Sequence, residues 1–321
     1  MLNKMTISNF YHFKDSYTLD LKGKKRVLLV GPKGSGKSSL GFALSNPFFY
    51  FTYQDDKKDH PQTIVTPNPY DQARLLFQFS APSGEITYRY GIDYEGGMNT
   101  EQVDLGKKTV LYRNMERRDY YTLEGDFENV EPMFLEVAGY FNSAIYAIMG
   151  YCKSYHGETA KDIDDFMMGL RYVNPLRAKN DRLIEKRLCQ HREHFEAIFE
   201  VLQSIGYPYD SFTLDKSKIF VHDPEKGDIR FLKEAPKNAI HLLRLFYACF
   251  GEYHNVELLY VDDFDEAFDE ETAKIALEII EIFRMKQVII ASKKELTAEK
   301  YVTMKLESCS DQAVLAIKGG N

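Results

Sequence analysis

Eight consecutive residues, Gly31–Ser38, have the pattern G-x-x-x-x-G-K-S, which is typical of a loop that binds phosphate groups. The glycines let backbone N–H groups turn toward phosphate oxygens, and the start of a following helix adds partial positive charge. Lys37 is expected to reach the β- and γ-phosphates and to assist catalysis, while the Ser38 hydroxyl would ligate Mg²⁺. The predicted nucleotide-binding residues are Gly31, Pro32, Lys33, Gly34, Ser35, Gly36, Lys37, Ser38 and Ser39.

The segments on both sides of this loop are those that a phosphate loop requires. Val27–Val30 is a continuous apolar run, as expected of a strand buried on both faces. Ser39–Leu44 has the composition of a helix start. The alternative is a chance glycine turn between a strand and a helix, and the number of matching fixed positions argues against it. The sequence therefore predicts a site for a nucleoside triphosphate.

A second apolar run, Leu258–Val261, ends in two carboxylates, Asp262 and Asp263. In a phosphate-loop fold we expect this strand beside the strand that precedes the loop, with Asp262 holding Mg²⁺ across from Ser38. Asp263 lies one residue further, where a carboxylate orients or deprotonates the attacking water, so it is the predicted catalytic base. The alternative is a solvated acidic turn over residues 262–266.

Composition bounds the class of protein. The chain has 321 residues, of which 44% are hydrophobic and 14% aromatic, enough for one large α/β domain with an insertion. Its net charge of −7 provides no general basic field for nucleic acid. No apolar run reaches membrane-spanning length and no signal peptide is evident, so we expect a cytoplasmic protein without a membrane partner. Four scattered cysteines argue against a disulfide framework: Cys152, Cys189, Cys249 and Cys309.

Strands alternate with helices at both ends of the chain, which predicts an α/β fold with a parallel-rich core sheet. Within a single domain over 1–321, residues 1–45 and 206–321 form the expected nucleotide-binding core, 73–127 an antiparallel β insertion and 131–205 a helical insertion. Residues 45–72 are expected to be loop-rich. The expected strands are 5–7, 17–21, 26–30, 257–261 and 287–291, with 301–306 and 313–317 as edge strands. The expected helices are 180–204, 240–250 and 271–283, with a hairpin over 212–221.

These motifs together resemble the ABC-type ATPases of the RecF, SMC and OLD group, and most closely its stand-alone bacterial AAA-like ATPases. The resemblance implies a P-loop NTPase fold of the ABC-ATPase head type, ATP and Mg²⁺ as ligands, and ATP hydrolysis. It also implies a homo-oligomer, either a head-to-tail dimer or a larger assembly, in which Asp269 takes the D-loop position. The segments that carry it are Lys4–Phe10, Gly31–Ser38, Thr87–Tyr94, Glu101, Leu111–Arg113, Leu258–Asp263 and Gln287–Ser292.

Three departures from the family pattern affect turnover. The second acid is Asp263 instead of glutamate, and its shorter reach predicts slow hydrolysis. The family's serine-x-glycine signature, which caps the partner's γ-phosphate, is replaced by Pro236 and Asn238. Lys293 stands near the position of a switch histidine, where a lysine supplies only a point charge. Asn238, Asp269 and Lys293 remain the candidates for a site shared between subunits, and we expect ATP binding to outlast hydrolysis.

The resemblance predicts an ATPase whose nucleotide state controls association with itself, with DNA or with an effector protein on another chain. Anti-phage defence or a toxin–antitoxin-like pair is the expected setting, and no nuclease domain is expected because the chain ends soon after its last buried strand. The alternatives are a nucleotide-gated scaffold with negligible hydrolysis and a RecF-like DNA-repair ATPase.

Other charged groups have weaker interpretations. DNA-facing stripes and solvated surfaces are alternatives for two basic stretches, Arg113–Arg118 and a set around the predicted long helix. His191 and His194 have a metal-compatible spacing on that helix, but no third ligand is evident, so no metal site is predicted. The basic residues of the second set are Arg171, Arg177, Lys179, Arg182, Lys186, Arg187 and Arg192.

Overall fold

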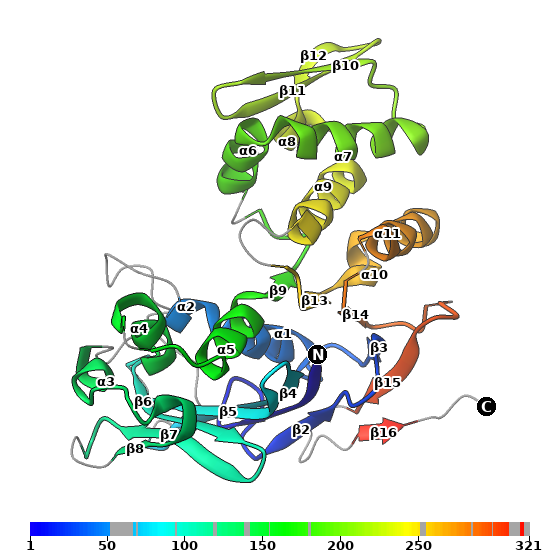
Figure 1. Ribbon diagram of the computed structural model, residues 1–321. Helices are drawn as coiled ribbons and strands as arrows, with labels where there is room; N and C mark the ends of the chain where they lie inside the picture. The colour runs from blue at the N-terminus through cyan, green and yellow to red at the C-terminus, as the bar shows by residue number, and fades with distance from the viewer. Residues whose placement is uncertain are drawn as a thin grey trace. The chain divides into compact units, whose positions relative to one another are not determined.

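The fold consists of two compact units along one chain. The first comprises Met1–Tyr172, His254–Tyr260 and Lys286–Asn321, and the second comprises Val173–Tyr253 and Val261–Met285. The computed structural model (Figure 1) describes residues 1–51, 67–68, 70–93, 95–117, 121–137, 142–153, 155–178, 181–250, 255–283, 285–296, 298–307 and 315–317. Most of the predicted loop 45–72, together with Tyr94, Arg118, Lys179 and residues 313–314, lies outside these ranges.

A seven-stranded antiparallel sheet of order β2-β1-β4-β5-β6-β7-β8 forms one part of the first unit. Strand β1 pairs with β4, with Ile7 opposite Leu75. The first two strands therefore belong to the antiparallel sheet, although the sequence grouped them with the nucleotide-binding core. Alternating burial along β1 explains this membership, because such a strand has one face to cover. The strands are β1 Leu2–Ser8, β2 Tyr17–Asp20, β4 Ala73–Ala81, β5 Gly84–Ile92, β6 Met98–Leu105, β7 Lys108–Asn114 and β8 Tyr121–Leu123.

A six-stranded sheet contains the two apolar strands that precede the predicted phosphate loop and the predicted carboxylate pair. Its order is β16-β15-β3-β14-β13-β9, and β3 pairs in parallel with both β14 and β15. The parallel pairing around β3 agrees with the predicted parallel-rich core. The strands are β3 Arg26–Val30, β9 Leu170–Val173, β13 Leu258–Val261, β14 Gln287–Ser292, β15 Val302–Leu306 and β16 Leu315–Ile317.

Three expectations about this sheet were wrong. Strand β14 separates β3 from β13, which had been expected to be direct neighbours. Every residue of β14 is buried, and the Gln287 side chain bonds the backbone of Leu2 and Lys24, so this strand needs a central position. Strand β15 lies between β16 and β3, so it is not an edge strand. Strand β9 was not predicted, because its four residues come directly after a helical pattern and are too few to establish a period of their own.

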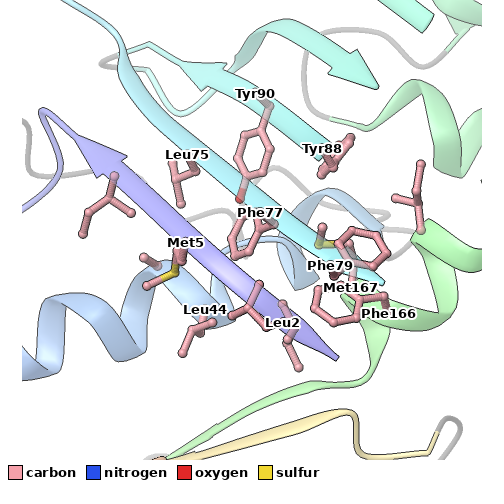
Figure 2. Packing of buried hydrophobic residues seen from close by; sticks show 14 of the residues in the cluster. Leu2, Met5, Leu44, Leu75, Phe77, Phe79, Tyr88, Tyr90, Phe166 and Met167 are labelled. Carbon is pink, nitrogen blue, oxygen red and sulfur yellow. The ribbon is translucent and has the colours of Figure 1, made fainter. Parts of the chain in front are cut away.

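Helices cover the antiparallel sheet and share its apolar core. Figure 2 shows Met5, Phe77 and Leu44 meeting there, from β1, β4 and α1. Phe79 stacks on Phe166 of α5, with ring centroids 3.9 Å apart. Full burial of side chains of this size contributes about 1.5–3 kcal/mol each, so this core anchors the unit. The helices are α1 Lys37–Ser45, α2 Phe48–Phe51, the 3₁₀ helix η1 Gly125–Phe127, α3 Met133–Val137, α4 Ala144–Tyr151 and α5 Thr159–Met168.

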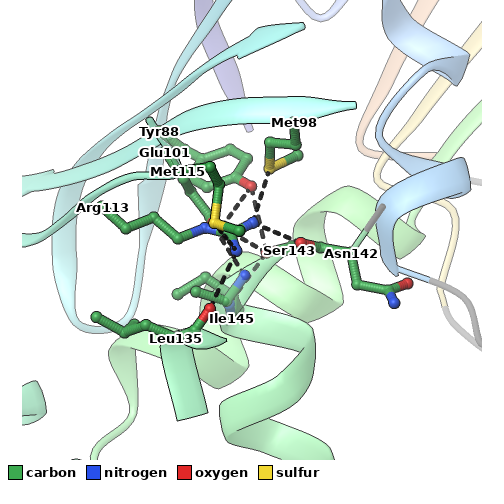
Figure 3. Close-up of polar contacts among 10 residues, drawn as sticks. Tyr88, Met98, Glu101, Arg113, Met115, Leu135, Asn142, Ser143 and Ile145 are labelled. Carbon is green, nitrogen blue, oxygen red and sulfur yellow. Dashed lines mark hydrogen bonds and ion pairs between the residues drawn. The ribbon is translucent and has the colours of Figure 1, made fainter. Parts of the chain in front are cut away.

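A buried ion pair ties this sheet to the loop before α4 (Figure 3). Arg113 Nε lies 2.8 Å from Glu101 Oε2, and Arg113 is 2% exposed. The Arg113 guanidinium also donates to the carbonyl oxygens of Leu135 and Asn142. Glu101 accepts further hydrogen bonds from the Ser143 hydroxyl and other donors. Arg113 therefore cannot face DNA, and its assignment to a basic surface was wrong.

Among its described residues, the second unit packs six helices with a small antiparallel sheet of order β10-β11-β12, which lies alongside α6, α7 and α8 in Figure 1. The single helix predicted over 180–204 is two helices, because the chain leaves helical geometry at His191 with φ −122° and ψ 73°. The predicted hairpin over 212–221 is part of the three-stranded sheet. The elements are α6 Asp181–Gln190, α7 Arg192–Ser204, β10 Ser211–Asp215, β11 Lys218–Asp223, β12 Gly227–Arg230, α8 Phe231–Glu234, α9 Lys237–Phe250, α10 Phe264–Ala267 and α11 Glu270–Ile282.

The compact units divide the chain differently from the predicted segments. Helices α3–α5 belong to the first unit and α6–α7 to the second, so the predicted helical insertion over 131–205 contains the boundary near Val173. In the parts of the chain that the structure describes, no helix is both long and apolar enough to cross a bilayer.

Candidate nucleotide site

The predicted phosphate loop follows β3 and leads directly into α1. The Gly31 N–H donates to the Ser292 carbonyl oxygen of β14 at 3.2 Å, and Ser292 lies opposite Val30 in the parallel register. The loop therefore begins at the carboxyl edge of the parallel strands, where ligands of open α/β sheets bind. Gly36 has φ +92°, and a Cβ there would lie 2.5 Å from the Phe13 ring, so this position requires glycine.

Lys37 is buried within the loop. Its Nζ donates to the carbonyl oxygens of Gly31 and Pro32 at 2.5 and 2.9 Å, and the residue is 6% exposed. The first turn of α1 contains no acidic residue, so the positive end of the helix dipole is not offset there. The loop thus combines a buried ammonium group, a helix N-terminus and turned backbone, which are the features that attract phosphate.

The other predicted loop residues differ in their access to solvent. Pro32, Lys33 and Gly34 are exposed, and Ser38 is half-buried. Ser35 and Ser39 are buried. The Ser39 hydroxyl lies 2.8 Å from Nδ1 of His12, an exposed residue that the sequence argument did not select. His12 lies in the turn after β1, just past the segment that carried the family resemblance.

Tyr260 connects the acidic strand to the start of α1. Its hydroxyl donates to the Lys37 carbonyl oxygen at 2.6 Å, and the side chain is fully buried. The Tyr260 ring stacks on Tyr172 of β9, with centroids 6.1 Å apart. The sequence showed Tyr260 only as part of an apolar run, although a buried tyrosine hydroxyl needs a partner. Asp262 follows Tyr260 by two residues in the chain.

Asp262 and Asp263 stand at the start of a second-unit segment and have defined local partners. Asp262 is fully buried, and its backbone N–H donates to the Val173 carbonyl oxygen at 2.8 Å. Asp263 has φ 48° and ψ 39°, a left-handed conformation that is uncommon for a residue with a side chain. Asn174 donates from Nδ2 to Asp263 Oδ2 at 2.8 Å. Asn174 follows β9, so missing that strand also hid this residue. The position of Asp262 opposite Ser38 stays a prediction.

Two of the three residues predicted for a subunit-shared site lie in contact within the second unit. Asn238 donates from Nδ2 to Asp269 Oδ2 at 2.7 Å. Asp269 caps α11 by accepting the Thr272 N–H at 2.9 Å, and the N–H and hydroxyl of Thr272 lower the pKa of this carboxyl. Lys293, the third residue, directly follows β14 in the first unit, at the same edge as Gly31.

The proposed basic stripe is not one continuous helix face. Arg171 lies in β9 of the first unit, and its guanidinium donates to the Leu170 carbonyl oxygen at 3.2 Å. Arg192 in α7 pairs with Glu196 at 2.7 Å. The guanidinium groups of these two arginines already bond to nearby groups of the same chain, which favours the solvated-surface interpretation.

Comparison with known proteins provides evidence for the fold. The sequence matches no protein-family model and, at a significant level, no curated protein sequence. The SMC head domain from Thermotoga maritima aligns over 99% of this chain and 99% of its own length, with 15% identity and a TM-score of 0.51. The fold is similar to that of an SMC head domain. A second SMC head, bound to the C-winged helix domain of ScpA, aligns over 98% of each chain with 14% identity and a TM-score of 0.51.

Proposed function

We propose that this SMC-head-like protein is an ABC-type ATPase that binds ATP together with Mg²⁺. The observation that carries the proposal is the phosphate loop, with Lys37 buried inside it at the carboxyl edge of the parallel strands. The link from Tyr260 to the Lys37 carbonyl oxygen supports a shared role for the loop and the acidic strand. When bound, Mg²⁺ would supply positive charge that offsets the negative charge of the phosphate groups.

The carboxylates and the loop have separate roles in this proposal. Ser38 and Asp262 are the residues that would hold Mg²⁺, because a hydroxyl and a carboxylate supply the oxygen ligands that it prefers. Asp263 would accept a proton from the attacking water, and Asn174 fixes the orientation of its carboxylate. An aspartate reaches less far than a glutamate, so we expect slow hydrolysis.

Nucleotide binding would then control association with a second copy or with another protein. The paired Asn238 and Asp269 lie at the starts of α9 and α11, and Lys293 lies beside the phosphate loop. These residues are our candidates for contacts to ATP bound by another copy in a head-to-tail dimer or larger assembly. The resemblance to OLD- and RecF-like ATPases motivates an effector on another chain, in anti-phage defence or a toxin–antitoxin-like system.

The direct test is Mg²⁺-ATP binding measured by calorimetry. Lys37→Ala should abolish binding, because it removes the ammonium group inside the loop. Lys274→Ala is the matched control, since it removes an equal charge from an exposed pair with Glu270. Undiminished binding of Mg²⁺-ATP by Lys37→Ala would contradict the proposal. Asp263→Asn should retain binding and lose phosphate release.

A nucleotide-gated scaffold with negligible hydrolysis is the second candidate. It is favoured by Pro236, which lacks the hydroxyl and backbone N–H of the usual signature serine. Phosphate release by the purified protein, alone and with the product of the adjacent gene, distinguishes the two candidates. A mass measurement with and without ATP tests association in either case. A RecF-like role instead requires ATPase activity that DNA stimulates and DNA binding that salt weakens.

A further inference from the structure

The break between α6 and α7 has no explanation in local helix chemistry. No glycine or proline occurs between Asp181 and Ser204, and the apolar period continues through the break. The break is at His191, which lies between the end of α6 and the start of α7. The His191 N–H still donates to the Arg187 carbonyl oxygen at 3.0 Å, while the His194 N–H donates to the His191 carbonyl oxygen at 3.0 Å.

This break brings three metal-ligating side chains together. His191 and Glu193 are two residues apart, and side chains at that separation do not face each other in a continuous helix. In the structure His191 Nδ1 lies 3.5 Å from Glu193 Oε1. One ligand atom from each of His191, Glu193 and His194 lies within 4.8 Å of the other two. Glu193 is therefore the third ligand. In a continuous helix its side chain would not face that of His191.

The surroundings of the cluster hold one ligand in place and leave the other two open to solvent. The His194 ring stacks on Phe250 of α9, with centroids 4.4 Å apart and an interplanar angle of 17°, which restricts its rotation. Phe250 in turn packs edge-on against Phe283 at 5.0 Å. The intervening Arg192 pairs with Glu196, so its charge is partly offset by that carboxylate. His191 and Glu193 are exposed, so an ion can reach them from solvent.

We propose that His191, Glu193 and His194 form a binding site for a divalent transition-metal ion, with Zn²⁺ as the best match. Two imidazole nitrogens and one carboxylate oxygen form a common zinc ligand set, with bonds of about 2.0–2.2 Å. Tetrahedral ligands at that distance lie about 3.4 Å apart, so the exposed side chains of His191 and Glu193 close on the ion by rotamer changes. Three protein ligands leave one position for water or for a group from another chain. The bound ion stabilises the break between α6 and α7.

The test is calorimetric titration of the full, tag-free chain with ZnCl₂, followed by Co²⁺ as a spectroscopic probe of tetrahedral geometry. We expect one Zn²⁺ per chain, with affinity about tenfold or more weaker in His191→Ala and in His194→Ala. Zn²⁺ should also raise the unfolding temperature of the wild type and not that of a double variant that combines His191→Ala with His194→Ala.

His222→Ala is the matched control. This partly exposed histidine of the same unit also has a carboxylate partner, Asp228 at 2.8 Å, yet it lies outside the cluster. Its removal should leave Zn²⁺ affinity unchanged. Three results would overturn the proposal: no stoichiometric Zn²⁺ binding by the wild type, unchanged affinity in His191→Ala, or loss of binding in His222→Ala. Equal unfolding temperatures without metal verify that the variants fold.

Discussion

Gly41→Ala is a sharp test of how tightly the helix after the phosphate loop is held. Gly41 lies one turn into α1. An added Cβ would lie 2.5 Å from Cδ2 of Tyr172 and 2.9 Å from Cε1 of Tyr260. The fully buried Tyr260 ring is held by the bond from its hydroxyl to the Lys37 carbonyl oxygen, and the half-buried Tyr172 ring contacts both Tyr260 and Phe42, so moving either ring breaks contacts.

Two opposing effects decide the sign of this substitution. Alanine in place of glycine inside a helix is worth up to about 1 kcal/mol in favour of folding. Overpacking of a well-packed core costs about 1–3 kcal/mol. Contacts below 3 Å against two aromatic rings, one of them fully buried, belong at the upper end of that range, so we expect a net loss of about 1–2 kcal/mol in the free energy of unfolding. Relief of these close contacts would displace α1, and this displacement should weaken ATP binding at the loop before the helix.

The assay is denaturant unfolding of Gly41→Ala beside a matched control, Gly150→Ala. Gly150 is also inside a helix, α4, but a Cβ there would meet no atom within 4 Å. The control therefore keeps the helix-propensity gain and lacks the steric cost, so it should be as stable as the wild type or more stable. If Gly41→Ala and Gly150→Ala unfold at the same denaturant concentration, the predicted steric cost at Gly41 is absent.

The remaining predictions concern three polar side chains, of which Tyr260 and Arg113 are buried and His241 is half-buried. Tyr260→Phe removes one buried hydrogen bond, so stability should fall by about 0.5–1.5 kcal/mol and ATP affinity should fall with it; unchanged ATP affinity would show that the link does not support the loop. Burial lowers the pKa of His241 below its ordinary 6.5, so its stabilising contribution is complete above 6.5 and is lost as pH falls through the lower folded-state pKa. The unfolding temperature should therefore drop more between about pH 7 and about pH 5 in the wild type than in His241→Gln, and parallel curves would contradict this. Arg113→Met leaves the Glu101 carboxylate buried without its cation, so denaturant unfolding should show a loss of about 3–5 kcal/mol, partly recovered by adding Glu101→Gln.

Motifs that are contiguous in the sequence were the best predicted. The phosphate loop, the apolar strand before it and the helix after it all occur as expected, because the pattern and the elements come from neighbouring residues. The second apolar strand, β13, was also predicted, since burial on both faces leaves a run without polar residues. The chemistry expected of Lys37, Asp262 and Asp263 followed from the same local patterns and stays a prediction.

Strand order could not be predicted in this way. The strands β13 and β14 are both fully buried, and neither run by itself indicates which one lies beside β3. The answer depends on distant groups, since Gln287 of β14 finds its partners at Leu2 and Lys24. The short strand β9 was hidden because its four residues are too few to establish a period.

The sequence by itself determined the phosphate-binding motif, the carboxylate pair and the periodicity of the long elements, because each depends on neighbouring residues. Only the tertiary structure decided which side chains meet across the chain: Tyr260 with the start of α1, Asn174 with Asp263, and Asn238 with Asp269. It also decided that the helix breaks at His191, which brings a ligand atom of Glu193 within 4.8 Å of ligand atoms of both histidines. These contacts depend on how distant segments share one buried space, and a pattern of neighbouring residues carries no information about that choice.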